Sequence, residues 1–540
     1  MSLGIGLSLG SVAARGRGTL GAPDWPEGAV ALWLILGQSN AEGWAPWQQD
    51  PGKADPALAV PSLTVEERAA HPWLRMSTRG SGSNAGQFPT SSQGIATEAF
   101  PRSSGKVYSG AESRADGIPD GTQAFGAEIA LVRHVREGTA PAGWRDDADP
   151  RLFLFKQAEG SKSVDYFRWG GDGQGLVLDA LRQANGTNLH GLAAAKTVLI
   201  QGVIFVIGEK DAKDVAPTGD TMAETLTPRF ADWVRQLRGA LGGDVPIAFC
   251  EVIENGAARA VSNVRMAELA GALPNAAVIE SQADWTDVGD ATHYDAQGQD
   301  RLGHAAFGHL RDTYGRPGDG LVTAFPFTGL KPWFHVPPVF IDDGGSQMRV
   351  AATPSAPGVV HALSTAPGTP TPSAQAIYDA RNGPDAFQRN VDAADVETVW
   401  YTGGGSFAAN QTRDVHFMLR ASDGTLGEVV TAVRGGNVKL SPDLSVGATT
   451  ATTAAATVGA SFAGTLHWAL HAGARDHMRG EDVEAMAFGP VQAGSVACTP
   501  GQTATLSLSG LSAGTTYTLF VTGRRSSDGL PSPTQKVQIV

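Results

Sequence analysis

The chain has 540 residues, which corresponds to about three or four domains of ordinary size. It carries 41 Lys and Arg against 54 Asp and Glu, and the net charge of −13 argues against a nucleic-acid-binding protein with a basic face. Only 18% of the residues are charged, while 68 are Gly and 32 are Pro, which favours turn-rich β domains or an extracellular surface. The 42% hydrophobic content argues against a disordered chain.

Residues 1–28 are expected to form a Gly-rich N-terminal arm. The apolar run Met1–Ala14 has no preceding Lys or Arg, so a cleaved signal peptide is the less favoured alternative. No run of about 18 apolar residues occurs, so we expect no membrane-spanning segment. Cys250 and Cys498 are expected in different domains and unpaired, and two cysteines are too few for a disulfide scaffold or a Cys-based zinc site.

Residues 29–316 alternate short apolar runs with longer amphipathic stretches. The apolar runs are nearly continuous, as in strands that are buried on both faces, and lie at 30–36, 152–155, 202–207, 247–252 and 277–279. Between 222 and 241, apolar residues recur every three or four positions, which predicts an amphipathic helix. This alternation predicts a parallel sheet covered on both faces, with ligands bound at the carboxyl ends of its strands.

The segment 44–122 is long, weakly periodic and rich in Gly, Ser and Pro. It directly follows the first predicted strand, so we expect it to form a wall of the substrate cleft. Its aromatic residues either offer faces for sugar stacking or form a local core, and both interpretations stay open: Trp44, Trp47, Trp73, Phe88 and Tyr108.

Residues 334–436 and 437–540 are predicted to form two β-sandwich domains. Gly358–Leu363 is echoed by Gly464–Leu470, 106 residues later, and a period of this size corresponds to one sandwich domain. The segment Leu508–Val521, which contains Tyr517, resembles the fibronectin type III signature, in which this tyrosine anchors a strand. The resemblance is specific for the last domain and weaker for the preceding one.

Three motifs follow predicted strands. Gly37–Gly43 reads GQSNAEG, and a serine placed directly after a buried strand can present its hydroxyl to a cleft, although a helix cap is an equal alternative. Asp290 and His293 are three residues apart, so the carboxylate can orient the imidazole that a serine nucleophile needs, or the pair marks a capped helix start. Glu209 follows the strand 202–207.

In order and context, these motifs resemble the SGNH hydrolases, and among them the sialate O-acetylesterase-like carbohydrate esterases. The segments 125–131 and 155–161 also resemble family motifs, and the resemblance covers residues 29–314. It implies a three-layer α/β fold with a flavodoxin-like parallel sheet and a serine esterase mechanism that uses no metal or cofactor.

Carried over by position, the resemblance implies that Ser39 is the nucleophile, His293 the base and Asp290 its orienting carboxylate. Glu209 matches a family glutamate that supports the histidine in some members, so it is the alternative partner. Supporting residues and the backbone donors of an oxyanion hole complete the site: Gln38 and Asn40 as supports, and the N–H groups of Ser39 and of either Gly126 or Gly160 as donors.

The chain departs from the family at two positions. Ile207 replaces a glutamine, so one side-chain donor is absent, and Glu159 replaces a glycine. The sequence therefore favours a carbohydrate O-acetylesterase acting on a surface polysaccharide, outside the cell or on a particle. The alternative is a weak or inactive polysaccharide-binding component of a phage-like particle that also contacts other tail proteins. This alternative rests on an analogy of domain architecture.

Overall fold

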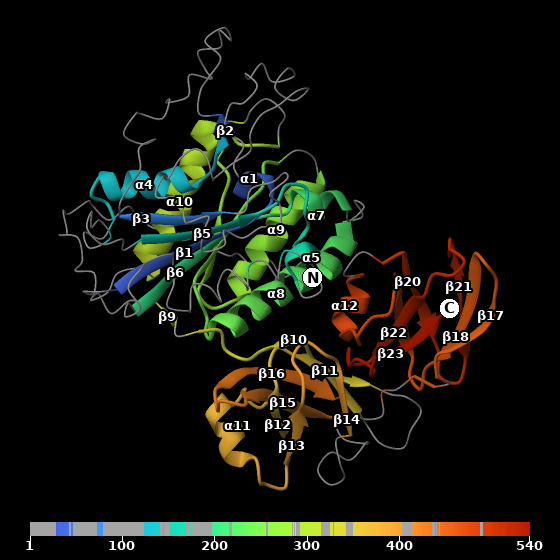
Figure 1. The fold of residues 1–540 in the computed structure, drawn as a ribbon. Coiled ribbons are helices and arrows are strands. Elements are labelled where there is room, and N and C mark those ends of the chain that lie inside the picture. The colour runs from blue at the N-terminus through green and yellow to red at the C-terminus, as the bar shows by residue number, and fades with distance from the viewer. Residues whose placement is uncertain are drawn as a thin grey trace, which may run out of the picture.

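A computed structural model shows an α/β domain followed by two β-sandwich domains (Figure 1). The elements and contacts of the structure are described within residues 29–42, 45–46, 73–78, 124–140, 144, 152–168, 173, 177, 197–214, 219–254, 257–282, 285, 287, 292–314, 325–327, 329–341, 349–401, 412–434, 438, 440–441, 443–486 and 490–540. The predicted N-terminal arm and most of the segment 44–122 lie outside these ranges.

The α/β domain contains a seven-stranded sheet in which six strands are parallel. The sheet has the order β3-β5-β1-β6-β7-β8, and β9 pairs with β6 in the antiparallel direction. All five predicted strands are confirmed, whereas β3 and β9 were not predicted. The strands are β1 (Ala29–Gly37), β3 (Leu74–Thr78), β5 (Leu152–Ala158), β6 (Thr197–Val206), β7 (Ile247–Cys250), β8 (Ala276–Ile279) and β9 (Phe325–Phe327).

Helices cover both faces of this sheet, as the continuous apolar runs predicted. Along β1, Trp33 and Ile35 pack on the face covered by α4 (Glu128–Arg136) and α10 (Ala296–Tyr314). Leu34 and Leu36 pack on the opposite face, covered by α8 (Gly219–Leu241) and α9 (Ala257–Ala272). The predicted amphipathic helix is confirmed as α8. The shorter elements are α1 (Ser39–Glu42), α5 (Val164–Phe167), α7 (Glu209–Asp214), β2 (Ala45–Pro46) and β4 (Ala124–Phe125).

The strand order places the end of β1 at the topological switch point. Without β3, the order β5-β1-β6-β7-β8 is that of a flavodoxin-like sheet, which confirms the predicted fold class. The chain leaves β1 toward β5 on one side and later returns to β6 on the other side. In open α/β sheets, ligands bind at this position, outside the carboxyl ends of the strands.

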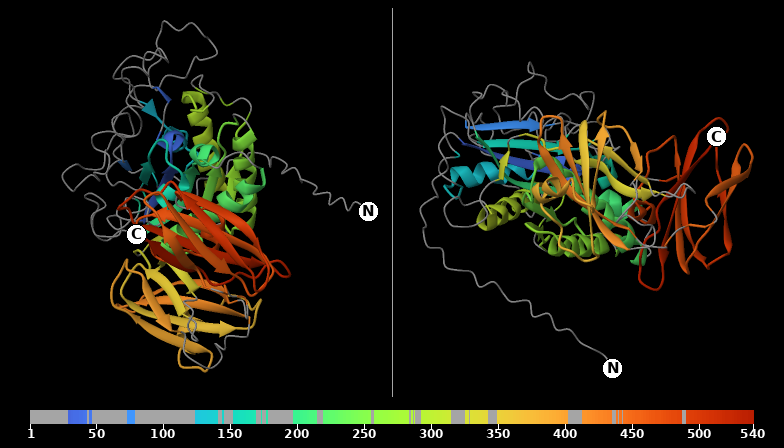
Figure 2. Two further views of the ribbon diagram at one scale, coloured as in Figure 1. Left: turned by 90° about the vertical axis from the view of Figure 1, so that its right-hand side faces the viewer. Right: turned by 90° about the horizontal axis from the view of Figure 1, so that it is seen from below.

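Each C-terminal domain is a sandwich of a three-stranded and a four-stranded antiparallel sheet, and Figure 2 shows both from two further sides. The first contains β10-β11-β14 and β13-β12-β15-β16; the second contains β17-β18-β21 and β20-β19-β22-β23. Their elements are β10 (Phe334–Ile341), β11 (Arg349–Pro354), β12 (Gly358–Thr365), α11 (Ala374–Ala380), β13 (Ala386–Val391), β14 (Thr398–Tyr401), β15 (Arg413–Ala421), β16 (Leu426–Arg434), β17 (Ser445–Thr449), β18 (Thr453–Gly459), β19 (Gly464–Ala472), α12 (Gly480–Glu484), β20 (Gln492–Cys498), β21 (Thr503–Ser509), β22 (Tyr517–Arg525) and β23 (Gln535–Ile539).

The two sandwiches repeat one strand arrangement, in agreement with the repeat in the sequence. Gly358 and Gly464 begin the equivalent strands β12 and β19. A Cβ atom at either glycine would lie 2.0–2.1 Å from a carbonyl oxygen of the neighbouring strand, so only glycine fits there. In the last domain, the buried Tyr517 side chain accepts a hydrogen bond of 2.9 Å from the Ser512 N–H, as the fibronectin type III resemblance implied.

A buried ion cluster joins the last sandwich to the α/β domain. The Arg168 guanidinium is fully buried, lies 3.0 Å from Asp232 on α8, and also pairs with Asp482 on α12. Arg479 completes the cluster by pairing with Asp232 at 3.0 Å and with Asp482 at 2.9 Å. Because the four side chains come from both domains and removing any one of them would unbalance the buried charge, this cluster stabilises the contact between the two domains.

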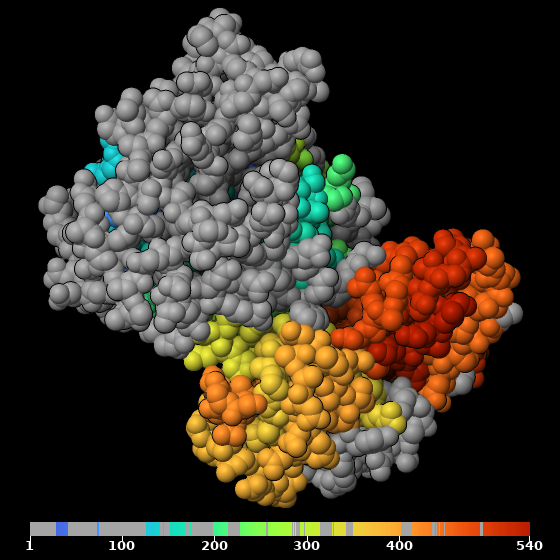
Figure 3. Space-filling model, in the orientation of Figure 1, coloured from blue at the N-terminus to red at the C-terminus, as the bar shows by residue number. Residues whose placement is uncertain are grey.

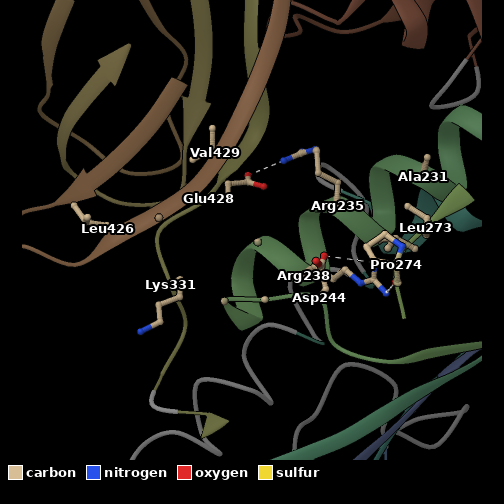
Figure 4. Close-up of a pocket in the computed structure, with 15 residues that line it drawn as sticks. Ala231, Arg235, Arg238, Asp244, Leu273, Pro274, Lys331, Leu426, Glu428 and Val429 are labelled. Atoms are coloured by element: carbon tan, nitrogen blue, oxygen red, sulfur yellow. Dashed lines mark hydrogen bonds and ion pairs between the residues drawn. The ribbon is translucent and has the colours of Figure 1, made fainter. Parts of the chain in front are cut away.

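The first sandwich contacts the same helix, α8, through a second ion pair. Figure 4 shows Arg235 of α8 reaching Glu428 of β16, with a nitrogen–oxygen distance of 2.7 Å. The Glu428 carboxylate also accepts from the Phe334 N–H, at the start of β10. The pocket drawn in Figure 4, about 440 Å³, therefore lies between the α/β domain and the first sandwich.

The two sandwiches also contact each other, as Figure 3 shows along one side of the molecule. The Thr534 N–H donates to the Phe340 carbonyl oxygen at 3.2 Å. Glu397 of the first sandwich accepts from His477 Nδ1 at 2.6 Å and from Lys536 Nζ at 2.9 Å, both in the second sandwich. Burial alone raises the pKa of Glu397, but these hydrogen bonds and the His477 charge lower it to about 2.

We expect Glu397→Gln to destabilise the protein at pH 7 by about 2–3 kcal/mol. A carboxyl whose pKa is lowered by folding stabilises the native state above its unfolded value of 4.5, and this contribution disappears as the pH falls toward 2. The measurement is the difference in free energy of unfolding between wild type and variant at several pH values. A difference that stays constant from pH 7 to pH 3 would contradict the assigned contacts.

Cys250 and Cys498 are both buried and free, as predicted. Within the described part of the chain, no helix combines the length and the apolar character that crossing a membrane requires.

Candidate active site

Ser39 lies at the carboxyl end of β1, where the chain turns sharply into α1. Gly37 has a φ of +145°, and a Cβ atom there would lie 1.9 Å from the Val206 carbonyl oxygen, so the turn requires glycine. The Gln38 N–H then donates to that same carbonyl oxygen at 3.1 Å, which ties the turn to β6. This turn places Ser39, the first residue of α1, beyond the edge of the sheet.

His293 faces Ser39 from the segment that precedes α10. The distance between His293 Nε2 and Ser39 Oγ is 2.9 Å, although the residues are 254 positions apart in the chain. This is the distance of a hydrogen bond between a nucleophile and its general base. The structure therefore brings together the two residues that the motifs single out for chemistry.

Asn40 fixes the segment that carries His293. Its Nδ2 donates to the Thr292 carbonyl oxygen at 2.9 Å, and its Oδ1 accepts from the Tyr294 N–H at 3.0 Å. The side chain of Asn40 is fully buried and thus holds both neighbours of His293. The sequence marked Asn40 only as a supporting residue and gave no indication of this contact.

Glu209 supports the Ser39 turn from the start of α7. Its carboxylate accepts one hydrogen bond from Gln38 Nε2 and another, of 2.7 Å, from Asn40 Nδ2. Burial raises the pKa of Glu209 above its ordinary value, and the hydrogen bond from Asn40 partly opposes this shift. Both carboxylate oxygens therefore hold residues adjacent to Ser39.

The two glycines considered as oxyanion donors have different surroundings. The Gly126 N–H donates to Glu128 Oε1 at 2.9 Å, so it is engaged within its own loop. Gly160 follows Glu159, whose N–H donates to the Gly37 carbonyl oxygen at 3.0 Å. This bond places the loop after β5 beside the Ser39 turn and favours Gly160. Asp290 lies outside the described residues.

A buried ion pair links two of the segments that resemble family motifs. Lys156 Nζ on β5 lies 2.8 Å from Glu128 Oε1 on α4, and neither side chain is more than 2% exposed. Glu128 also accepts the Gly126 N–H. The sequence did not predict this pair, because a single charged residue such as Glu128 or Lys156 gives no indication of its partner. The available signal was that each of the two residues lies in a segment that resembles a family motif.

The expectation that Trp73 either stacks on sugar or forms local core is resolved in favour of the core. Trp73 is 2% exposed and packs in the apolar cluster between the sheet, α4 and α10. The other aromatic residues named for this segment lie outside the described ranges. Among the described residues, no three His, Cys, Asp or Glu side chains are grouped as they would be around a metal ion.

Ile207, where the resemblance implied a glutamine, lies in the apolar core. It is fully buried in the cluster that includes Ala212 of α7 and Met266 of α9. Glutamine at this position is therefore expected to bury an amide without a partner.

We expect Ile207→Gln to lower the free energy of unfolding by about 2–4 kcal/mol, because an apolar contact is lost and a polar group is buried. The expected esterase rate is no higher than that of wild type. Chemical denaturation and turnover on an acetyl ester measure the two effects, with Ile207→Val as the control that keeps the site apolar. A stable variant with increased turnover would show that the amide points toward Ser39.

Residues 124–310 match the family model described as SASA: carbohydrate esterase, sialic acid-specific acetylesterase. The α/β domain is similar to these carbohydrate esterases. The resemblance that the motifs indicated is thus confirmed over this segment, which includes Glu209 and His293 but begins after Ser39. No curated protein matches the sequence.

Solved structures show similarity at low identity. A protein from Arabidopsis thaliana has 13% identity and a TM-score of 0.36, covering 53% of this chain and 98% of its own. A carbohydrate acetylesterase from Xanthomonas citri has 16% identity and a TM-score of 0.28, covering 74% of this chain and 78% of its own. A two-domain fibronectin type III segment of chicken tenascin has 8% identity and a TM-score of 0.14, covering 39% of this chain and 98% of its own.

Proposed function

We propose that this protein is a serine esterase that removes O-acetyl groups from carbohydrate. The observation that carries the proposal is the 2.9 Å contact between Ser39 Oγ and His293 Nε2 at the switch point of the sheet. The match of residues 124–310 to a carbohydrate esterase family supports the substrate class.

In this mechanism, His293 Nε2 accepts the proton of Ser39 as Oγ attacks the acetyl carbonyl carbon. The protonated imidazole then donates that proton to the departing sugar oxygen, which leaves an acetyl group on Ser39. A water molecule, deprotonated by His293, attacks this ester. The protonated His293 then returns the proton to Ser39 as acetic acid leaves, and the acid ionises to acetate in solution. Asp290 is proposed to orient the imidazole, and Glu209 to position the residues around Ser39.

The negative oxygen of each tetrahedral intermediate needs donors that are in place before the reaction. We assign this role to the backbone N–H groups of Ser39 and Gly160. Ser39 begins a helix, so its N–H needs no helical acceptor. Ile207 packs in the core and has no side-chain donor, which supports our assignment of this role to backbone donors.

The test is acetate release from an O-acetylated bacterial polysaccharide by the full chain, with the deacetylated polysaccharide and Ser39→Ala as controls. Release by wild type alone supports the proposal. If wild type binds the polysaccharide but releases no acetate, the non-catalytic, particle-bound alternative is favoured instead.

A further inference from the structure

A second cavity lies where all three domains meet, away from Ser39. It has a volume of about 520 Å³, within the range of small-molecule sites. Its lining comes from α8, β10, β16, α12 and the segment that joins β22 to β23, and contains four arginines and one glutamate: Arg235, Arg434, Arg479, Arg524 and Glu481. The lining of this cavity is therefore rich in positive charge.

Arg434 is the exceptional residue in this lining. It ends β16 on the side that carries Val430 and Ala432 into the domain core, and it is 1% exposed. In the part of the chain that the structure describes, none of its three guanidinium nitrogens has a hydrogen-bond partner. Burial lowers the pKa of this guanidinium, which reflects the cost of the uncompensated charge.

The other three arginines of the lining are paired. Arg235 contacts Glu428, Arg479 contacts Asp482, and Arg524 contacts Glu484 at 2.8 Å. In the neighbouring pocket of Figure 4, Arg238 likewise donates to the carbonyl oxygens of Val245 and Pro274. The unpaired guanidinium is thus specific to Arg434 among these side chains.

We propose that this cavity binds an anionic saccharide whose carboxylate pairs with Arg434. A buried guanidinium without an acceptor is energetically unfavourable, and a bound anion compensates its charge. The planar guanidinium fork matches a carboxylate through two parallel hydrogen bonds. The volume of the cavity admits a sugar ring around the carboxylate. The saccharide part rests on the proposed function, whereas the anion site does not.

The experiment compares wild type, Arg434→Met and the control Arg525→Gln as full chains. Arg525 is a matched residue that pairs with Asp528 and does not line the cavity. The probes are glucuronate, glucose and inorganic phosphate, measured by titration calorimetry and thermal denaturation. We expect glucuronate to bind wild type and Arg525→Gln equally and Arg434→Met about 10- to 100-fold more weakly, because a charge-assisted pair is lost. Glucose should bind at least 10-fold more weakly than glucuronate.

Thermal denaturation measures the same effect when binding is too weak for calorimetry. Without ligand, Arg434→Met should melt above wild type because an unpaired charge is removed, while glucuronate should raise the Tm of wild type and of Arg525→Gln but not that of Arg434→Met. If Arg434→Met fails to fold, Arg434→Lys replaces it, with at least 10-fold weaker glucuronate binding expected because the fork is lost.

Equal glucuronate affinity in wild type and the Arg434 variant would overturn the site, as would no binding to either. Phosphate binding as tight as glucuronate would overturn the saccharide assignment. Failure here is distinguishable from failure of the esterase proposal, because acetate release should be unchanged in Arg434→Met and glucuronate binding unchanged in Ser39→Ala.

Discussion

Ser39→Ala is expected to lower turnover on an acetyl ester by on the order of 10⁴- to 10⁶-fold, because no other group at this position can form the acetyl-enzyme. Its stability should stay within about 0.5 kcal/mol of wild type, since the hydrogen bond to His293 is a single contact at the rim of the sheet. Steady-state kinetics and chemical denaturation of the same samples measure both effects.

Ser163→Ala is the matched control for this experiment. Ser163 precedes α5 near the same edge of the sheet, and its side chain makes no capping hydrogen bond. Its replacement should leave turnover within a factor of about two of wild type. Turnover that falls equally in both variants would mean that the loss reflects general disturbance of this edge rather than removal of a nucleophile.

Glu209→Gln is expected to reduce turnover about 100-fold and to destabilise the protein by about 1–3 kcal/mol. Gln38 Oε1 accepts from the Lys210 N–H and Asn40 Oδ1 accepts from Tyr294, so both amides must present their nitrogens to residue 209. A carboxylate accepts from both, whereas an amide accepts through its oxygen alone. One donor then faces another donor, and the Ser39 turn moves.

The control for Glu209→Gln is Glu137→Gln, an exposed residue at the C-terminal end of α4. It changes the same charge without touching the site, so kcat and stability should both stay near wild type. If Glu209→Gln keeps the wild-type kcat and loses only stability, Glu209 does not position the reacting residues. A loss that appears only in KM would lead to the same conclusion.

The sequence predicted the sheet well because its strands are buried on both faces. β1 and β6 are nearly continuous apolar runs, and such runs stand out from amphipathic helices. β3 reads Leu-Arg-Met-Ser-Thr and lies at the sheet edge, where alternation is short and polar residues are tolerated. β9 has only three residues and contains Pro326, and a proline within a short apolar run argues against predicting a strand there.

The candidate site was predictable in its residues but not in its contacts. Ser39 and His293 belong to recognisable motifs, whereas their 2.9 Å contact depends on the long-range hydrogen bonds of Asn40 and Glu209. The direction of the Ile207 side chain could not be predicted either. The residue type at one position does not show whether the side chain at a strand end points into the core or toward the site. The domain contacts of Arg168 join residues 314 positions apart and leave no local pattern.

Covalent trapping of the nucleophile tests the central claim most directly. The full chain is incubated with a fluorophosphonate, which phosphonylates activated serines, then digested, and the labelled peptide is located by mass spectrometry. The account predicts one label, on Ser39, that abolishes acetate release in proportion to its extent and forms at least about 100-fold more slowly in His293→Ala. Acetate release that continues at the wild-type rate with Ser39 fully labelled would contradict the account.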